Sequence, residues 1–96
     1  MEIRWLEDAL ADTTEIYRYI AADNPRAASR VLEHIQAAIR SLAELPHRGR
    51  PGRWPGTREL IIPGTPYIVP YRLEGEVIEI LRVFHGARRW PEEPVE

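Results

Sequence analysis

Apolar residues recur at intervals of three and four through the first half of the chain, which is the spacing of an amphipathic helix. The first stripe consists of Leu6, Ala9, Leu10, Thr13, Ile16, Tyr17 and Ile20. The second consists of Ala28, Val31, Leu32, Ile35, Ile39 and Leu42, and extends toward Leu45. Asn24 is a good N-cap and proline is tolerated at the first helical position, so Asn24-Pro25 predicts the start of the second helix. That helix should end before Pro46, because the residue preceding a proline disfavours the helical conformation. The short link between the stripes predicts an antiparallel helical hairpin.

The apolar period changes from 3.6 to 2 in the second half of the chain. Residues 46–56 carry three prolines and three glycines, and therefore predict a loop. Alternating segments then predict a strand beginning at Thr57 and two more over Pro66–Leu73 and Glu76–His85. Gly75 supplies the positive φ that a two-residue hairpin turn before the last strand requires. We expect these three strands to form an antiparallel meander.

The middle strand of this meander contains a proline. Because Pro70 lacks an N–H and would break a hydrogen bond of the sheet, we expect a bulge or a non-bonding edge there. The last strand is apolar on both sides near its middle. Alternation along that strand places Arg82 and His85 on opposite faces.

These elements predict an α+β fold, in which a helical hairpin packs on one face of a small antiparallel β-sheet. A short strand or extended lead-in over Glu2–Leu6 precedes the hairpin. At 96 residues, the chain is expected to form a single domain spanning residues 1–96. The absence of cysteine excludes disulfides, zinc-thiolate sites and a cysteine nucleophile, and fits a reducing cytoplasm. Nothing resembles a signal peptide or a membrane span, so a cytoplasmic protein is expected. The sequence contains no sign of a metal or a cofactor.

Charge is unevenly distributed along the chain. All 13 cationic side chains are arginines, and 15 acidic residues leave a net charge of −2. This balance excludes a net basic field that would draw the whole molecule to nucleic acid. Residues 46–58 nevertheless hold four arginines and one histidine without an acid, and the stretch VFHGARRWP closes the last strand. One interpretation is a basic face that contacts a macromolecule. A coding bias toward arginine and a rigid, solvated connection are the alternatives.

Two groups of side chains have more than one interpretation. Arg82 has apolar neighbours, so its guanidinium should need an internal carboxylate, for which Glu59 and Glu79 are the candidates. Arg58 and Arg72 can each be ordinary solvated strand residues. The three tryptophans, Trp5, Trp54 and Trp90, either form part of the core or cover the seam between the helices and the sheet. A core position is favoured for Trp5.

The chain resembles the RelE/ParE superfamily of bacterial toxins from type II toxin-antitoxin modules over nearly its whole length. The resemblance lies in the order and spacing of four segments. These are DNPRAA at residues 23–28, LxxxPxxGRPG at 42–52, RELIIPGTPYIVPYRL at 58–73 and EILRVFHGARRWP at 79–91. The resemblance implies the RelE/ParE toxin-like fold, and a toxin of a plasmid-stabilisation module that arrests growth when it is free.

Members similar to RelE cleave mRNA on the ribosome, which requires a base, an acid and cations for the phosphorane charge. If the chain is such an endoribonuclease, the base and the acid come from His85, Glu59, Glu79 or a tyrosine, with His85 the natural candidate and Arg82 a cation of the site. The alternative for His85 is a partly buried residue whose ring nitrogen bonds a backbone carbonyl. Three departures count against this activity. Tyr67 stands where the RelE-like branch carries an arginine, the chain contains no lysine, and Trp90 stands where those nucleases carry a functional tyrosine.

Members similar to ParE poison DNA gyrase by binding it, and they need a contact surface without proton-transfer chemistry. Arginine and tryptophan are enriched at the energetic anchors of protein interfaces, which fits this branch. The missing catalytic residue types favour it over the nuclease branch and argue against an enzyme. The candidate residues for target or antitoxin binding are Arg53, Arg58, Arg72, Arg82, His85, Arg88, Arg89 and Trp90. A non-toxic interaction module on the same fold is a third possibility.

The resemblance also implies partners. A cognate antitoxin is expected to cover the toxin with a C-terminal segment that folds as it binds and that is acidic and apolar. The target is DNA gyrase or, for the nuclease branch, the ribosome with its mRNA. Promoter DNA is expected to be bound only through the antitoxin, and no membrane partner is expected.

Overall fold

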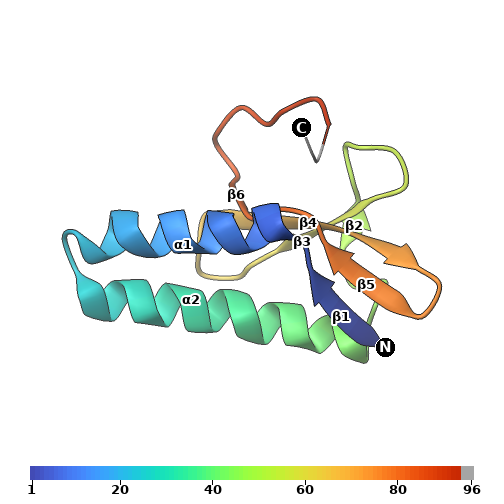
Figure 1. Cartoon of the computed structure of the whole chain (residues 1–96), viewed down its shortest axis with the longest axis horizontal. Helices are drawn as coiled ribbons and strands as arrows, with labels where there is room; N and C mark the ends of the chain where they lie inside the picture. Colours follow the sequence, from blue (N-terminus) through green and yellow to red (C-terminus); the bar gives the residue numbers. More distant parts are fainter. Residues whose placement is uncertain (94–96) are drawn as a thin grey trace.

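The computed structural model describes residues 1–93 (Figure 1). The chain begins with strand β1 (Glu2–Trp5), which leads into helices α1 (Glu7–Ala21) and α2 (Pro25–Arg40) and a 3₁₀ turn, η1 (Ser41–Ala43). The remaining elements are β2 (Arg50–Pro51), β3 (Arg58–Ile61), β4 (Tyr67–Glu74), β5 (Val77–Ile80) and β6 (Phe84–His85). No helix within residues 1–93 is long and apolar enough to cross a membrane.

The strands form one mixed sheet with the order β1-β5-β4-β3-β2, and β6 pairs with the other half of β4. β3, β4 and β5 are antiparallel neighbours, as the alternation predicts. β1 joins the sheet parallel to β5. The predicted α+β fold class is therefore confirmed, with one parallel pair added at the edge. The predicted loop contains a short bridge, because Arg50 and Pro51 pair with the start of β3.

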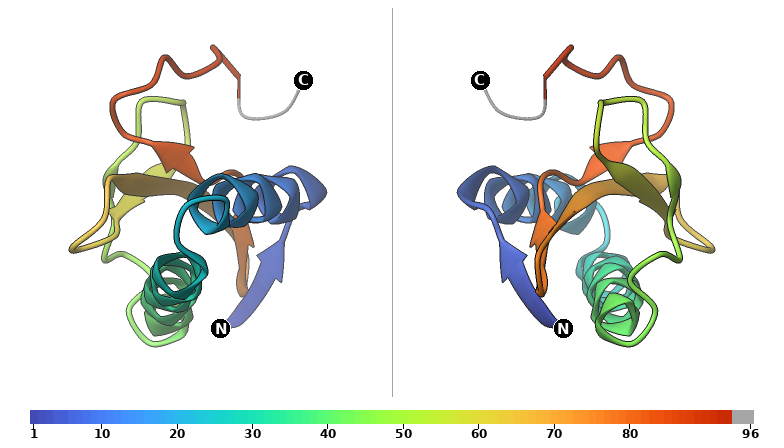
Figure 2. Two further views of the ribbon diagram at one scale, coloured as in Figure 1. Left: turned by 90° about the vertical axis from the view of Figure 1, so that its left-hand side faces the viewer. Right: turned by 90° about the vertical axis from the view of Figure 1, so that its right-hand side faces the viewer.

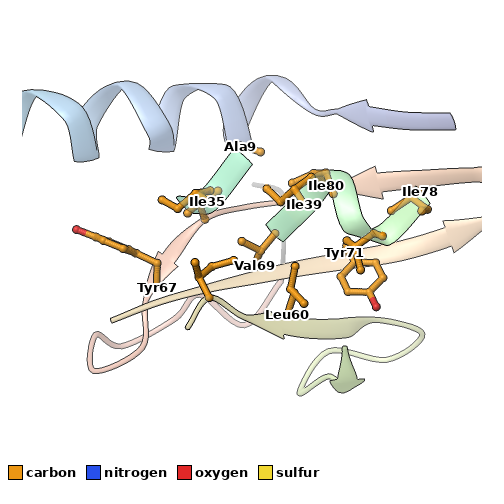
Figure 3. Close-up of a cluster of buried hydrophobic side chains, with 12 residues drawn as sticks. Ala9, Ile35, Ile39, Leu60, Tyr67, Val69, Tyr71, Ile78 and Ile80 are labelled. Atoms are coloured by element: carbon orange, nitrogen blue, oxygen red, sulfur yellow. The ribbon is translucent and has the colours of Figure 1, made fainter. Parts of the chain in front are cut away.

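The helical hairpin forms as predicted. The Asn24 side chain accepts a hydrogen bond from the backbone N–H of Ala27 at 3.1 Å, and Pro25 occupies the first helical turn. The core lies between α2 and the sheet, where Ile35 and Ile39 face Val69 (Figure 3).

Three residues of the predicted apolar stripes lie outside this core. Leu10 is 51% exposed and Tyr17 is 42% exposed, because α1 packs beside α2 and directs only its Ala9 side inward. Leu45 is also exposed, since α2 ends at Arg40 and the chain turns away after η1.

The strand register contains the bulge expected at Pro70. Ile68 lies opposite Phe84, whereas Tyr71 lies opposite Ile80, so two residues of β4 face three residues, 81–83, of the neighbouring segment. The extra residue is on the partner segment, and the Pro70 carbonyl still accepts a hydrogen bond from Leu81 N at 3.0 Å. The bulge divides the predicted last strand into β5 and β6.

Candidate functional site

A cleft of about 510 Å³ lies between α1 and the segment that follows the bulge. Its lining residues come from α1, from β4 and from the chain around β6, and they are Asp12, Glu15, Ile16, Tyr19, Tyr67, Arg82, Val83, Phe84, His85, Ala87, Arg88 and Arg89. We call residues 86–93 the C-terminal arm. Figure 2 shows the arm rising from β6 on the side of the sheet away from α2, next to the loop around residues 51–57.

Asp12 connects α1 to the bulge in the wall of the cleft. Its Oδ2 accepts hydrogen bonds from Arg82 Nε at 2.8 Å and from Val83 N at 2.9 Å, and its Oδ1 accepts one from Arg82 Nη2 at 3.0 Å. The bulge leaves the Val83 amide without a partner in the sheet, so the carboxylate satisfies this amide and neutralises the guanidinium together. Both side chains of the pair are less than one fifth exposed. A short, two-point ion pair of this kind is strongly directional.

The partner of Arg82 differs from the predicted one. Glu59 and Glu79 were the expected candidates, but Glu59 binds Arg50 and Arg53, and Glu79 binds Arg72 at 2.6 Å. The reason is the bulge, which interrupts the alternation that the prediction assumed. Arg82 and His85 line the same cleft, although alternation along the strand predicts opposite faces for them.

Glu59 binds the loop around residues 50–53, which lies next to the C-terminal arm. This carboxylate is only 3% exposed, and it accepts hydrogen bonds from Arg50 Nε and Nη2 and from the backbone N, Nε and Nη2 of Arg53, at 2.8–3.3 Å. Burial alone would raise the pKa of the Glu59 carboxyl, but the hydrogen bonds from Arg53 and Arg50 outweigh it and hold the pKa below its ordinary value of 4.5. The carboxylate is therefore charged at neutral pH.

The arm is held in place by two adjacent aromatic rings with a guanidinium group on each outer side. The Arg53 guanidinium carbon lies 3.4 Å from the centre of the Trp90 ring, and the Arg82 carbon lies 4.6 Å from that of Phe84. Trp90 and Phe84 contact each other at 4.8 Å between ring centres. We call Arg53, Trp90, Phe84 and Arg82 the arginine–aromatic stack. Trp54 packs against both rings and donates a hydrogen bond to the Pro91 carbonyl at 3.0 Å.

The arginine–aromatic stack shows that the predicted cationic and aromatic residues do not all lie on one exposed face. Trp90 is only 9% exposed, so it braces the arm instead of offering a surface contact. Arg58 donates to the carbonyls of His47 and Gly49, and it lines a separate depression with Arg72.

The cleft gathers part of the predicted set. Arg82, His85, Arg88 and Arg89 meet there, and the last two are exposed. Arg53 is exposed on the neighbouring loop, where it is held by Glu59 and Trp90. The cationic surface of the cleft is thus smaller than the sequence suggests.

Sequence reasoning missed the helix side of the cleft. Asp12, Glu15 and Tyr19 line it, although the helical stripe assigned the first two only to the polar face of the helix. Tyr19, which is 77% exposed, carried no signal beyond being an aromatic residue on a polar face. A partner 70 positions away in the chain leaves no local pattern around Asp12.

The chemical capacity of the cleft is that of a binding surface. Burial raises the pKa of the Tyr67 phenol, so this group stays protonated near neutral pH. His85 Nδ1 accepts a hydrogen bond from Ala87 N at 3.1 Å, which leaves Nε2 to act toward a ligand. Asp12 and Glu15 also line the cleft, but the charge of Asp12 is matched by Arg82, and Glu15 lies beside Arg18.

Comparison with known proteins identifies the family of this chain. The sequence model of the ParE toxin of the type II toxin-antitoxin system parDE matches residues 3–90. The chain belongs to the ParE toxin family. It is 49% identical over 90 residues to the protein Y4kP of Sinorhizobium fredii (strain NBRC 101917 / NGR234), a match that covers 94% of this chain and 93% of the relative. It is 36% identical over 87 residues to the toxin RelE2 of Caulobacter vibrioides, covering 91% and 97% of the two chains.

Solved structures support the same assignment. A chain of the chromosomal ParDE toxin-antitoxin system from P. aeruginosa matches this ParE-family fold with a TM-score of 0.81 and 31% identity. A chain of the toxin-antitoxin complex RelBE2 from Mycobacterium tuberculosis matches it with a TM-score of 0.60 and 30% identity. Both comparisons cover 88% of this chain and 95% of the other. The expected membership of the RelE/ParE superfamily is confirmed.

Proposed function

We propose that this ParE-family toxin, when free, arrests growth by binding and poisoning DNA gyrase. The observation that carries the proposal is the bidentate bond between Asp12 and Arg82. An endoribonuclease of this fold would need a cation at that position for the transition-state charge. Here the guanidinium is already neutralised by a carboxylate of its own chain, which favours a binding toxin over a nuclease.

Further features of the cleft support the same choice. Proton transfer requires an acid and a base with pKa values near the working pH, and Tyr67 is shifted away from that range. The Tyr67 ring is the neighbour of His85, at 5.8 Å between ring centres. Because Asp12 matches its charge, Arg82 offers little net attraction to an RNA backbone approaching His85. A protein target carrying its own cations and apolar groups fits this mixed surface better.

The choice of target predicts a specific pair of assay results. Purified gyrase should lose supercoiling activity when the free chain is added, and programmed ribosomes should retain intact mRNA. Replacement His85→Gln should leave gyrase inhibition within about twofold of the wild type, since no proton moves in a binding mechanism. Cleavage of ribosome-bound mRNA that disappears in His85→Gln would instead assign the nuclease function and overturn the proposal.

We further propose that a cognate antitoxin neutralises the toxin by placing an acidic, apolar segment in the cleft. Arg88 and Arg89 are exposed there, and the cleft also presents the apolar surfaces of Ile16 and Tyr19. Carboxylates of the antitoxin would pair with the two guanidinium groups, and its apolar side chains would cover the aromatic wall. A segment that folds on binding can follow such a bent surface.

The double replacement Arg88→Ala/Arg89→Ala should weaken antitoxin binding by about 10- to 100-fold, because interface arginines are common energetic anchors. The difference from the wild type should shrink at high salt, where charge pairs are screened. Titration calorimetry of the toxin with its antitoxin provides the measurement. Arg26→Ala/Arg30→Ala is the matched control, since these two exposed arginines lie on α2. Equal losses in both double variants would remove the arm from the antitoxin interface.

A further inference from the structure

The outer edge of β1 is an open end of the sheet. β1 pairs only with β5 within residues 1–93, and it is the terminal strand of the sheet order. Figure 2 shows it at the margin of the fold, beneath the start of α1, with no other strand outside it. An unpaired edge presents a row of free backbone N–H and C=O groups that can pair with another strand.

The backbone groups that point outward can be assigned from the bonds that point inward. Glu2 N donates to the Glu76 carbonyl at 3.2 Å, and Leu6 N donates to the Ile80 carbonyl at 3.0 Å. Because the direction of backbone groups alternates along a strand, the N–H and C=O of Ile3 and Trp5 point away from β5. Neither a proline nor a bulge interrupts the edge between these residues.

We propose that a second copy of this chain docks on this edge, with the two β1 strands antiparallel and the two-fold axis at Ile3. This register places Ile3 opposite Ile3, and it places Glu2 of each copy opposite Arg4 of the other. Glu2 and Arg4 already lie on one exposed face, where Arg4 Nη2 bonds Glu2 Oε2 at 3.1 Å. The edge is therefore complementary in charge to itself.

The alternative antiparallel register supports the choice of Ile3 as the centre. Moving the axis by one residue would set Arg4 directly against Arg4 and Glu2 against Leu6. Like charges directly opposite each other destabilise a strand pair, whereas opposite charges stabilise it. The Ile3 register removes that repulsion and gains two cross-chain ion pairs by symmetry.

The surface beside the edge is suited to burial in such a dimer. Ile3 and Trp5 line a groove of about 470 Å³ together with the exposed Leu10. Met1, at the start of the strand, is 40% exposed. Pairing of one short strand, over residues 1–5 of each copy, buries less than a standard interface, so these apolar groups must contribute. We expect a weak dimer with a dissociation constant in the micromolar range.

Sedimentation velocity of the full chain, freed of antitoxin, tests the dimer over concentrations of about 1 to 300 µM. The wild type should shift from monomer to dimer. Glu2→Arg and Arg4→Glu should each weaken the dimer at least about tenfold, because each sets like charges opposite each other twice. An equimolar mixture of the two variants should form heterodimers, and the double variant Glu2→Arg/Arg4→Glu should regain the homodimer. Thermal unfolding of each variant checks the fold.

A second variant protects the test against misfolding of Arg4→Glu, whose new carboxylate would lie beside Glu79 on β5. Ile3→Pro removes the outward N–H at the centre of the proposed pair and leaves the bonds to β5, so it should be monomeric. A wild type that stays monomeric throughout would overturn the proposal. In that case, protection of the Ile3 and Trp5 amides from hydrogen exchange only in the presence of antitoxin would show that the antitoxin occupies this edge.

Discussion

Replacement Asp12→Ala is expected to lower the free energy of unfolding by about 2 to 3 kcal/mol. The variant leaves the Arg82 guanidinium and the Val83 amide without the carboxylate that both use, in a region that is mostly shielded from water. The penalty comes from the buried Val83 amide, which loses its acceptor, and from the loss of the two-point ion pair with Arg82. Urea unfolding followed by circular dichroism gives the value.

Two controls separate this effect from a general loss of charge on α1. Glu15→Ala removes an exposed carboxylate three residues away, whose ion pair with Arg18 is largely solvated, and it should change stability by less than about 0.5 kcal/mol. Asp12→Asn keeps the shape and one acceptor oxygen, so its loss should be intermediate. Equal stability of Asp12→Ala and Glu15→Ala would mean that the bulge does not depend on Asp12.

Replacement Glu59→Gln is expected to remove part of the acid sensitivity of the fold and to destabilise it by about 2 kcal/mol at neutral pH. The folded-state pKa of Glu59 lies below its ordinary value of 4.5. A carboxyl with a lowered pKa contributes stability that is fully present above that ordinary value. The contribution is lost as the pH falls from 4.5 through the folded-state pKa. The glutamine variant lacks this titration, so its stability should fall less steeply in that window.

Unfolding measured between pH 7 and pH 3 compares the two proteins. Glu76→Gln serves as the control, because Glu76 is exposed and should leave the acid dependence nearly unchanged. If Glu59→Gln follows the wild-type pH curve in parallel, the lowered pKa of this carboxyl is not a source of acid sensitivity.

Because Glu59 holds the loop that contacts Trp90, the arm should also become more accessible to protease in the variant.

The fold was largely predictable because its signals are local. The helical hairpin follows from apolar spacing and the Asn24 cap, and the meander follows from alternation around Gly75. Even the disturbance at Pro70 follows from one missing N–H, although the extra residue is on the neighbouring segment. The exposure of Leu10 was not predictable, because the spacing of apolar residues along a helix does not show which of them will contact the sheet.

The candidate site was less predictable because its contacts join distant parts of the chain. Arg82 was expected to need a carboxylate, but the choice of Asp12 depends on a bulge that resets the alternation. The contrast between buried Trp90 and exposed Arg88 also depends on how the arm folds back onto Trp54.

If the free toxin poisons gyrase by binding it, cleaved DNA should be trapped on the enzyme, and the amount of this DNA can be measured directly. Purified gyrase is incubated with supercoiled plasmid, ATP and the free chain, and linear DNA is quantified after protein denaturation. Linear DNA should accumulate with toxin concentration, remain with His85→Gln, and disappear when antitoxin is added first. Unchanged plasmid at saturating toxin, together with cleavage of mRNA on programmed ribosomes, would contradict the account.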